Sequence, residues 1–578
     1  MLTSKSSEEI MAKEAVIFQA PKFDGNIYTK LTGFKGGVVE KIQTVKYDLF
    51  YGTTMHESIV KDAPYYLAAT FTNVPDREPE EYYCRILVTY LDDSQEMFES
   101  KKITLKRVEF PEVKSAVSHV IDRFFTSRAN FRPYTNAEKY YISILFEKNG
   151  FDKFEKEKKR EAYNKVSSKA VLTKVFSDAD IRNNSLGKFS ELYTIENDNL
   201  TIDEMLDITE ELESLPYIKF AVLSPVVKDD TLWEREQNTE EAITVKKNVQ
   251  PETPDFSPLQ DYLEPSSDIL KGLNIREAWK HTTGLHATTR HLDLNGIRQD
   301  HEDLEENITV VTNSEDWETN NTHSTACNGV IAAKKNSYGV TGIVHGGNHF
   351  SYASNNTAGT KLIADILRDA GPGDVISMSM GLIYDADGTR VNIPYIAVKE
   401  WWEGVKEIVE NKQAIFLLAA GNSSSDITVQ IERGYFTDYG DCGVYLAQGC
   451  HKETGRHNPW SNHNYHSSHI NAWNEWVVTT GRGTLYGEEH ARNAYHAGMT
   501  GTSISTPLAA GALALIQSYA IEKYNIFLNR DQMLALLEET GGKEAEYPGS
   551  KRGKMGYRPD AVAGITFIDS IMQANDIR

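Results

Sequence analysis

The sequence has few cysteines, no excess of positive charge and no long unbroken apolar stretch. Four cysteines in 578 residues are too few for a disulfide-built scaffold. A net charge of -22 argues against nucleic acid or an anionic membrane surface as the main partner. The apolar stretch at 507–516 is far shorter than the roughly 20 residues that a membrane span needs. We therefore expect a globular protein of several domains without a membrane span.

The N-terminus also lacks the continuous apolar core of a secretory signal peptide. We expect a cytoplasmic protein, and export by a route that needs no signal peptide is the alternative. Cys442 and Cys450 are close enough in sequence to form a disulfide in an oxidising compartment. In a reducing cytosol both are expected to be free thiols.

Residues 1–150 are predicted to form a β-rich domain, a small sandwich, because apolar runs alternate with turn-like segments. The runs lie at 65–72, 82–90 and 102–110. Helices are expected to follow at about 111–130 and 136–148. No motif identifies a function here, so a regulatory or partner-binding role is a prediction from position alone.

A charged linker or helix is expected at 151–167, followed by a small α+β domain at 168–227. Its pattern is strand, strand, helix, strand, and the amphipathic helix at 201–214 has an acidic first turn. Residues 228–261 are polar, acidic and contain proline, which is typical of a linker.

From residue 262 to the end, short apolar strands alternate with helical patterns. Near-continuous apolar strands are expected at 291–294, 375–380 and 414–420, with a helix at about 393–410. Such strands fit a sheet covered on both faces. We predict an α/β domain with a mostly parallel sheet and helices on both faces, whose site lies at the carboxyl ends of the strands.

Four polar residues in this region combine into one chemical hypothesis. Ser503 lies in GTSISTP, which is either a helix N-cap or a nucleophile turn. Asp293 ends an apolar strand, where a buried carboxylate is costly unless it is used. His323 opens a helix of small residues, and Asn422 follows the strand that ends in AAGN. Each alone is more often a turn, a cap or a structural histidine.

Together these stretches resemble the subtilisin-like serine proteases, the subtilases, whose triad follows the order Asp, His, Ser. The matching motifs are HSTACNGVIAA (323–333), SMG (379–381), AAGN (419–422) and GTSISTP (501–507). The resemblance implies a subtilisin-like protease domain at 262–578 that cleaves peptide bonds through an acyl-enzyme. It implies a triad of Asp293, His323 and Ser503, with Asn422 in the oxyanion hole. The implied substrate-binding residues are Ser379, Met380, Gly381, Ala420 and Gly421.

This chemistry suits these residue types. A serine hydroxyl needs a base, an imidazole titrates near neutrality, and a carboxylate fixes the imidazole tautomer. The sequence departs from the family at Ser324, where glycine is commoner, and in Asp293-Leu294-Asn295-Gly296. Asp300 and Asp303 are therefore weaker rivals for the acid. Cys327 lies one helical turn after His323 and resembles a buried thiol of one subtilase branch.

The same resemblance implies that 168–227 is a propeptide, an intramolecular inhibitor whose last strand lies in the substrate cleft by strand addition. The protein would then be a zymogen that cleaves itself within 228–261. The alternative is a structural domain that is never cut. The implied partners are a protein or peptide substrate and the chain's own propeptide.

Three further alternatives remain. A catalytically silent subtilase fold could serve as a binding scaffold. Two cysteines and five histidines could hold a structural zinc, although their spacing fits no common zinc motif; they are Cys442, Cys450, His451, His457, His463, His466 and His469. No cofactor is expected to be required. Calcium is common in the family, but no ligand loop is identifiable.

Overall fold

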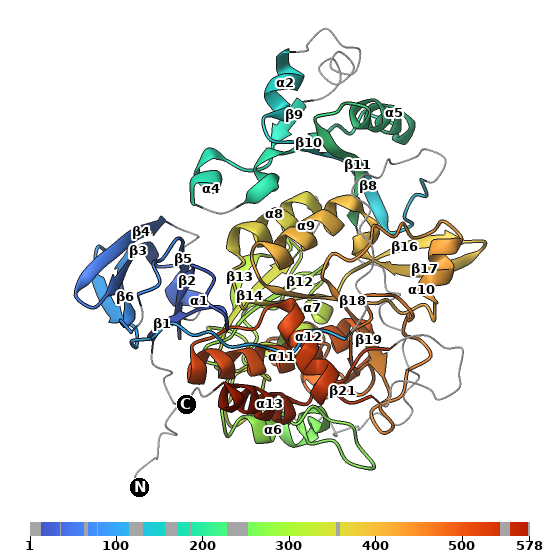
Figure 1. The fold of residues 1–578 in the computed structure, drawn as a ribbon. Helices are drawn as coiled ribbons and strands as arrows, with labels where there is room; N and C mark the ends of the chain where they lie inside the picture. Colours follow the sequence, from blue (N-terminus) through green and yellow to red (C-terminus); the bar gives the residue numbers. More distant parts are fainter. Residues whose placement is uncertain are drawn as a thin grey trace.

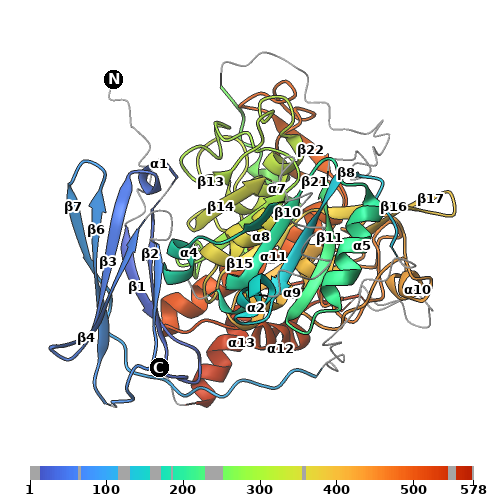
Figure 2. The same cartoon turned by 90° about the horizontal axis from the view of Figure 1, so that it is seen from above.

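The computed structural model describes residues 13–575 except for 35, 63–66, 78, 115–130, 157–170, 184–185, 228–251, 354–358 and 544–554. Three regions are distinct in Figure 1: a β-rich domain in blue, a smaller α+β domain in teal and green, and a large α/β domain in light green to red. The view from above shows the β-rich domain beside the α/β domain (Figure 2).

The β-rich domain consists of two antiparallel sheets with strand orders β1-β2-β5 and β4-β3-β6-β7. Buried residues from both sheets form one hydrophobic cluster. The strands are β1 (Glu14–Phe18), β2 (Ile27–Thr32), β3 (Ile42–Tyr51), β4 (Thr54–Asp62), β5 (Ala68–Phe71), β6 (Tyr82–Tyr90) and β7 (Gln95–Glu99). The prediction of a strand at 102–110 is wrong, because that segment forms only isolated β-bridges. Of the helix expected at 111–130, residues 115–130 lie outside the described part.

The predicted helix at 136–148 is wrong as well. These residues form β8 (Ala137–Phe146), a central strand between β11 (Ile218–Val227) and β10 (Leu192–Glu196). Tyr and Ile suit a strand that is paired on both edges, and a short apolar run alone does not separate strand from helix. The expected boundaries at 150 and 168 are therefore corrected, because the α+β domain begins before β8.

The remainder of the α+β domain follows the predicted order. β9 (Val171–Lys174) is the edge strand, and α5 (Ile202–Glu213) begins with a capping box between Thr201 and Glu204. The charged linker expected at 151–167 begins with α2 (Gly150–Lys156), and its residues from 157 lie outside the described part.

The large domain confirms the predicted α/β fold. Its seven-stranded sheet has the order β13-β14-β12-β15-β18-β19-β20, and every pair is parallel. The strands are β12 (Thr288–Asp293), β13 (Thr309–Thr312), β14 (Asn348–Ala353), β15 (Val375–Met378), β18 (Ile415–Ala419), β19 (Tyr445–Cys450) and β20 (Ile470–Trp473). Parallel strands place their carboxyl ends at one edge, so Asp293 and the turns after β15 and β18 meet there.

Both faces of this sheet are buried, as alternate residues show. Ile415 and Leu417 of β18 pack into one hydrophobic cluster, and Phe416 and Leu418 pack into the other. Helices α8 (Gly359–Asp369) and α9 (Lys399–Glu410) cover the second face. The first face is covered by α7 (Thr322–Ala332), α11 (Thr502–Tyr524), α12 (Arg530–Thr540) and α13 (Ala561–Ala574).

Helix α9 begins at Lys399 and not at about 393. The preceding residues form a hairpin of β16 (Gly381–Ala386) and β17 (Thr389–Pro394). The pattern that predicted a longer helix therefore included a strand that ends at a proline, which does not favour a helix interior.

The expected linker at 228–261 is also shorter than predicted. Phe256 is buried in the core of the large domain, and its backbone N–H donates to the Gly339 carbonyl at 2.6 Å. Only residues before this anchor can act as a free connection, and 228–251 lie outside the described part.

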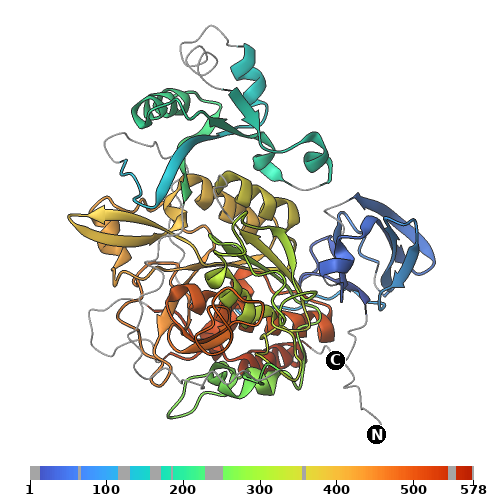
Figure 3. The same ribbon diagram turned by 180° about the vertical axis from the view of Figure 1, so that it is seen from behind.

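The two smaller domains pack against different faces of the large one, as the view from behind shows (Figure 3). In the β-rich domain, the rings of Phe18 and Tyr28 contact the ring of Phe527, 6.1 and 5.3 Å from its centroid. The Phe527 N–H also donates to the Gln19 carbonyl at 3.1 Å. The sheet of the α+β domain packs on α8 and α9.

One described helix, α11, is long and apolar enough to cross a membrane by length and composition. The sequence estimate considered only 507–516, but the helix extends to Tyr524. The most apolar part of this helix is completely buried inside the α/β domain, which explains why the helix is apolar on every side.

Candidate active site

Asp293 is the last residue of β12, and its side chain is buried. His323 Nδ1 lies 2.9 Å from Asp293 Oδ1 and 2.8 Å from Oδ2. The Leu294 backbone N–H donates to Oδ1 at 2.7 Å. Burial alone would raise the pKa of Asp293, but His323 and the hydrogen bond from His291 outweigh it and hold the pKa well below its usual range. The carboxylate is therefore ionised at neutral pH.

His323 is the second residue of α7 and is largely buried. The helix is built from small residues and packs closely against α11 and against the strand β21 (Val477–Thr480). At Gly329 an added Cβ would lie 2.1 Å from Thr480 Oγ1, so only glycine fits there. This close packing fixes the imidazole against Asp293.

Ser503 lies in the first turn of α11, after Gly501 with φ +99°. The helical donor for its carbonyl would be the N–H of residue 507, but that residue is Pro507 and has none. Two side chains replace the missing donor. Ser379 Oγ donates to the Ser503 carbonyl at 2.7 Å, and Cys327 Sγ donates to it at 3.4 Å. Both therefore hold the Ser503 backbone in place.

Asn422 follows Gly421, which turns the chain after β18 with φ +102°. Its Oδ1 accepts from the Thr502 N–H at 2.7 Å, and Thr502 Oγ1 accepts from the Gly421 N–H at 3.1 Å. The turn is thus tied to the start of α11. Within the described residues, Asn422 Nδ2 and Ser503 Oγ are buried and have no hydrogen-bond partner. A buried donor without a partner is costly unless a ligand completes it.

The residues expected to bind substrate lie along this edge of the sheet, but their side chains differ in placement. Met380 and Ala420 are buried in the hydrophobic core, and the Ser379 hydroxyl is occupied by the Ser503 carbonyl. Gly381 begins β16, and an added Cβ at Gly421 would lie 2.4 Å from the side chains of Asn392 and Asn462. A substrate would therefore meet mainly backbone here.

The two weaker candidates for the acid lie elsewhere. Asp300 pairs with Arg298, and the Asp303 carboxylate accepts from Asn336 Nδ2 and the Val340 N–H, each at 2.8 Å. Burial raises the pKa of Asp303 to about 7. The aspartate that contacts His323 Nδ1 is therefore Asp293.

His301, from the same segment, should make stability depend on pH. Its Nδ1 accepts from the Asp303 N–H at 3.2 Å, and its Nε2–H donates to the Ala494 carbonyl at 2.8 Å, so the ring is held neutral. Burial lowers its pKa to about 4, below the usual value near 6.5. Because the unfolded chain binds a proton at His301 more readily than the folded protein does, acidification favours unfolding. The contribution of the neutral ring to the free energy of unfolding is therefore fully present above pH 6.5 and is lost as the pH falls towards 4.

We therefore expect about 3 kcal/mol of stability to be lost over this pH interval through His301. His301→Gln should be less stable at pH 7.5 but should lose less on acidification. Urea unfolding midpoints measured between pH 7.5 and 4.5 test this, and equal pH slopes for both proteins would contradict it.

The alternative of a zinc site formed by these cysteines and histidines finds no support in the described residues. Cys442 and Cys450 are buried and are not joined by a disulfide. His451 binds Glu475, and His466 binds Asp438. One other group has ligand-like spacing: donor atoms of His291, Asp293 and Cys327 lie within 4.8 Å of one another. A cation there would displace the N–H groups that Asp293 already accepts, so the cluster is better explained as a hydrogen-bond network.

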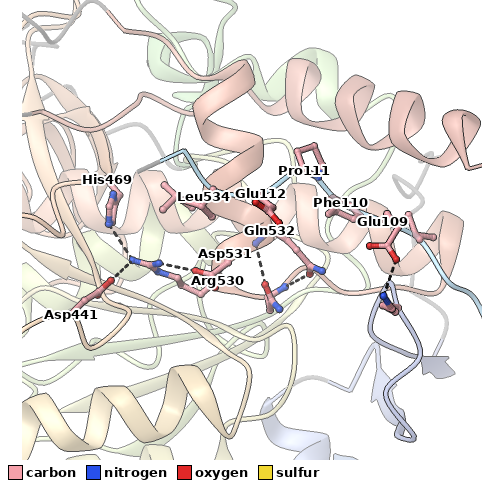
Figure 4. A pocket seen from close by; sticks show the side chains of 14 residues that line it. Glu109, Phe110, Pro111, Glu112, Asp441, His469, Arg530, Asp531, Gln532 and Leu534 are labelled. Atoms are coloured by element: carbon pink, nitrogen blue, oxygen red, sulfur yellow. Dashed lines mark hydrogen bonds and ion pairs between the residues drawn. The ribbon is translucent and has the colours of Figure 1, made fainter. Parts of the chain in front are cut away.

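A cavity of about 390 Å³ lies between residues 108–113 and the start of α12. Arg530 lines it and donates to Asp441 and towards His469 (Figure 4). None of the residues described above as the candidate active site lines this cavity, so it is separate from that site.

The model of the Subtilase family matches residues 282–556. This segment is thus similar to the subtilases. Among curated proteins, the chain is 25% identical over 328 residues to the proprotein convertase subtilisin/kexin type 6 of Rattus norvegicus. This alignment covers 52% of this chain and 32% of that protein. The chain is also 27% identical over 288 residues to an intracellular serine protease of Paenibacillus polymyxa, an alignment that covers 47% of this chain and 79% of that protein. The α/β domain is therefore similar to subtilisin-like serine proteases, and the chain spans only about a third of the length of the first relative.

Solved structures give weaker similarities to the α/β domain. A lanthipeptide protease is 16% identical with a TM-score of 0.40, over 54% of this chain and 96% of that one. A prenylagaramide maturation protease is 15% identical with a TM-score of 0.38, over 51% and 98%.

Sequence reasoning missed one residue of the candidate site, His291, which contacts the carboxylate of Asp293. It named Ser379 as a substrate-binding residue, but the Ser379 hydroxyl contacts the backbone of Ser503 instead of standing free in the cleft. The signal for Ser379 was available, because Pro507 must leave the carbonyl four residues earlier without a helical donor. Alternate residues of a strand point to the same face of the sheet, so a strand that ends at Asp293 places His291 on the same face as Asp293.

Proposed function

We propose that this chain is a serine endopeptidase in which Ser503 attacks the scissile carbonyl. The observation that supports this most is the buried, ionised Asp293 that accepts Nδ1–H of His323 at 2.8 Å within a subtilase-like domain. That bond leaves Nε2 as the basic nitrogen of a neutral imidazole.

In the proposed reaction, Ser503 Oγ bonds to the carbonyl carbon and its proton passes to His323 Nε2. The resulting oxyanion accepts from Asn422 Nδ2 and from the Ser503 N–H, which faces outward at the helix start. His323 then protonates the departing amine, and the peptide bond breaks to give an acyl-enzyme. Water attacks the ester with His323 again as base, which releases the acid and restores Ser503.

A fluorophosphonate probe and a peptide library, each applied to wild type and to Ser503→Ala, test the proposal. We expect wild type to be labelled and to cut peptides, and the variant to do neither. Unlabelled, inactive wild type with a native unfolding transition would favour the alternative, a catalytically silent scaffold. The proposed chemistry uses only groups of this chain, so activity should persist in EDTA; calcium would act on stability.

Ser379 should support kcat rather than substrate affinity. In Ser379→Ala the Ser503 carbonyl would lose the hydroxyl that replaces the missing N–H of Pro507, and the nucleophile would be less well positioned. A roughly tenfold lower kcat is expected with KM within about twofold, the size of one lost hydrogen bond in a reacting geometry. Steady-state kinetics test this, and a raised KM with unchanged kcat would instead assign Ser379 to substrate binding.

We also propose that the α+β domain, which includes the residues just before β8, holds the protease in a latent state. Ser143 and Ser224 of its sheet donate to Glu400 of α9, the former at 2.7 Å, and burial raises the pKa of this carboxyl group. The expected inhibitory strand, β11, pairs with β8, and its continuation beyond Val227 lies outside the described residues.

A second segment of the same domain reaches the strand expected to bind substrate. Asn136 Nδ2 donates to the Gly381 carbonyl at 3.2 Å, and Asn136 Oδ1 accepts from the Ile383 N–H at 2.9 Å. The Thr135 N–H donates to the Ile383 carbonyl at 2.6 Å. These backbone groups of β16 are the kind that an extended peptide would use, so Asn136 favours a covered cleft.

Asn136→Ala should therefore raise the initial rate of peptide hydrolysis by the uncut chain about five- to tenfold, because two hydrogen bonds to the Gly381–Ile383 edge are lost. Mass spectrometry must show that the chain is intact at the time of assay. Lys139→Ala, an exposed change on the adjacent strand, is the matched control. Equal rates for the two variants would contradict occupation of this edge, and no Ser503-dependent cleavage within 228–261 would contradict autoprocessing.

A cytoplasmic location stays a prediction. A regulatory role for the β-rich domain likewise stays a prediction.

A further inference from the structure

A second histidine contacts the acid of the site. His291 lies two residues before Asp293 on β12, so both side chains point to the same face of the sheet, the one covered by α7. Its Nε2 is 3.2 Å from Asp293 Oδ2, and it is buried. The reaction described above gives His291 no part.

A neighbouring strand fixes the ring of His291. β12 and β15 pair in register with His291 opposite Ser377, and Ser377 Oγ lies 2.8 Å from His291 Nδ1. A hydroxyl can donate to a neutral Nδ1 or accept from a protonated one. The ionised Asp293 carboxylate can only accept, so the nitrogen that faces it, Nε2, carries a hydrogen, and in the neutral ring Ser377 Oγ donates to Nδ1.

We propose that His291 is a positioning residue that holds the carboxylate of Asp293 in the orientation that serves His323. The inference rests on the proposed function. Asp293 Oδ1 is fixed by the Leu294 N–H, and His291 supplies the matching donor for Oδ2. With a donor on each oxygen in addition to His323, the carboxylate cannot rotate without breaking a hydrogen bond in a buried site.

The surroundings of His291 contain few other charges that could take over this role. Asp293 is on its own strand, and Cys327 on α7 is in the same cluster of donor atoms. The positions paired with it on β14 and β15 are the hydroxyl residues Ser351 and Ser377. Helix α11 also packs on β12, but its charged residues, Glu522 and Lys523, lie in its last turn.

The donor hydrogen can be tested with two variants of similar size. His291→Gln keeps an N–H at the end of the side chain, whereas His291→Leu has none. The Leu variant should have kcat lowered about tenfold with KM within about twofold. Its Asp293 would keep more negative charge for His323, so the acid limb of the kcat profile should move to higher pH by about half a unit. The Gln variant should recover most of kcat and the wild-type acid limb.

A purely structural role would give a different pattern. It would lower the unfolding midpoint and the labelled fraction of both variants while leaving the acid limb of the active fraction unchanged, and that result would overturn the proposal. Wild-type kcat and pH profile in the Leu variant would overturn it as well. If the Leu variant does not fold, Ser377→Ala decides: a shifted acid limb supports the proposal, and an unchanged one contradicts it.

One measurement does not depend on activity. In protein labelled with ¹⁵N-histidine, the signal that disappears in His291→Gln should show a hydrogen on Nε2 across the pH range of the native state. A bare Nε2 would overturn the proposal. Failure of the proposed function appears separately, as wild type that neither cuts peptides nor reacts with the fluorophosphonate probe while the Nε2–H signal is present.

Discussion

Asp293→Asn should lower kcat about 10⁴-fold and leave the fold intact. An amide in place of the carboxylate can present N–H to His323 Nδ1, which would favour the tautomer with hydrogen on Nε2 and remove the base. It would also remove the negative charge that stabilises the imidazolium. The measurement is single-turnover hydrolysis of a peptide ester or amide as a function of pH.

Two other aspartates of the same segment are natural controls. Asp300→Asn changes a partly exposed ion pair with Arg298 and should leave kcat within about twofold. Asp303→Asn disturbs a buried carboxylate that accepts from Tyr495 at 3.0 Å and should lower stability more than kcat. If Asp300→Asn or Asp303→Asn lost as much kcat as Asp293→Asn, the assignment of the acid would be wrong.

The α/β class and the edge that carries the site were predictable because they follow from patterns of neighbouring residues. Strand β18 is an unbroken apolar run. A parallel sheet brings the turn after this strand, which contains Asn422, to the edge where β12 ends at Asp293. The order of the motifs then linked residues that are more than 200 positions apart, from Asp293 to Ser503.

The features that could not be predicted depend on contacts between distant strands. β8 resembled a helix because a short apolar run has no clear period, and its partners β10 and β11 come some 50 to 80 residues later. The contact of His291 with Ser377 likewise needs the register of β12 and β15. A buried histidine in an apolar strand is visible in the sequence, but what it faces depends on the pairing.

Asn422→Ala should lower kcat about 10²- to 10³-fold with a much smaller change in KM, because the lost amide acts on the oxyanion and not on the bound peptide. Two features make this site a sensitive test. Asn422 Oδ1 accepts from the Thr502 N–H, which sets the direction of Nδ2, and Gly421 is held to Thr502 by a second hydrogen bond.

Asn422→Asp separates the two roles of the side chain. It keeps an acceptor for the Thr502 N–H but places a negative charge where the oxyanion would form, so kcat should fall at least as far as in Asn422→Ala while the unfolding midpoint changes less. Pre-steady-state acylation of Ser503 gives the rate directly. If both variants acylate within a few-fold of wild type, Asn422 is not the oxyanion donor, and the N–H of Ser503 at the start of α11 would have to carry that charge with another group.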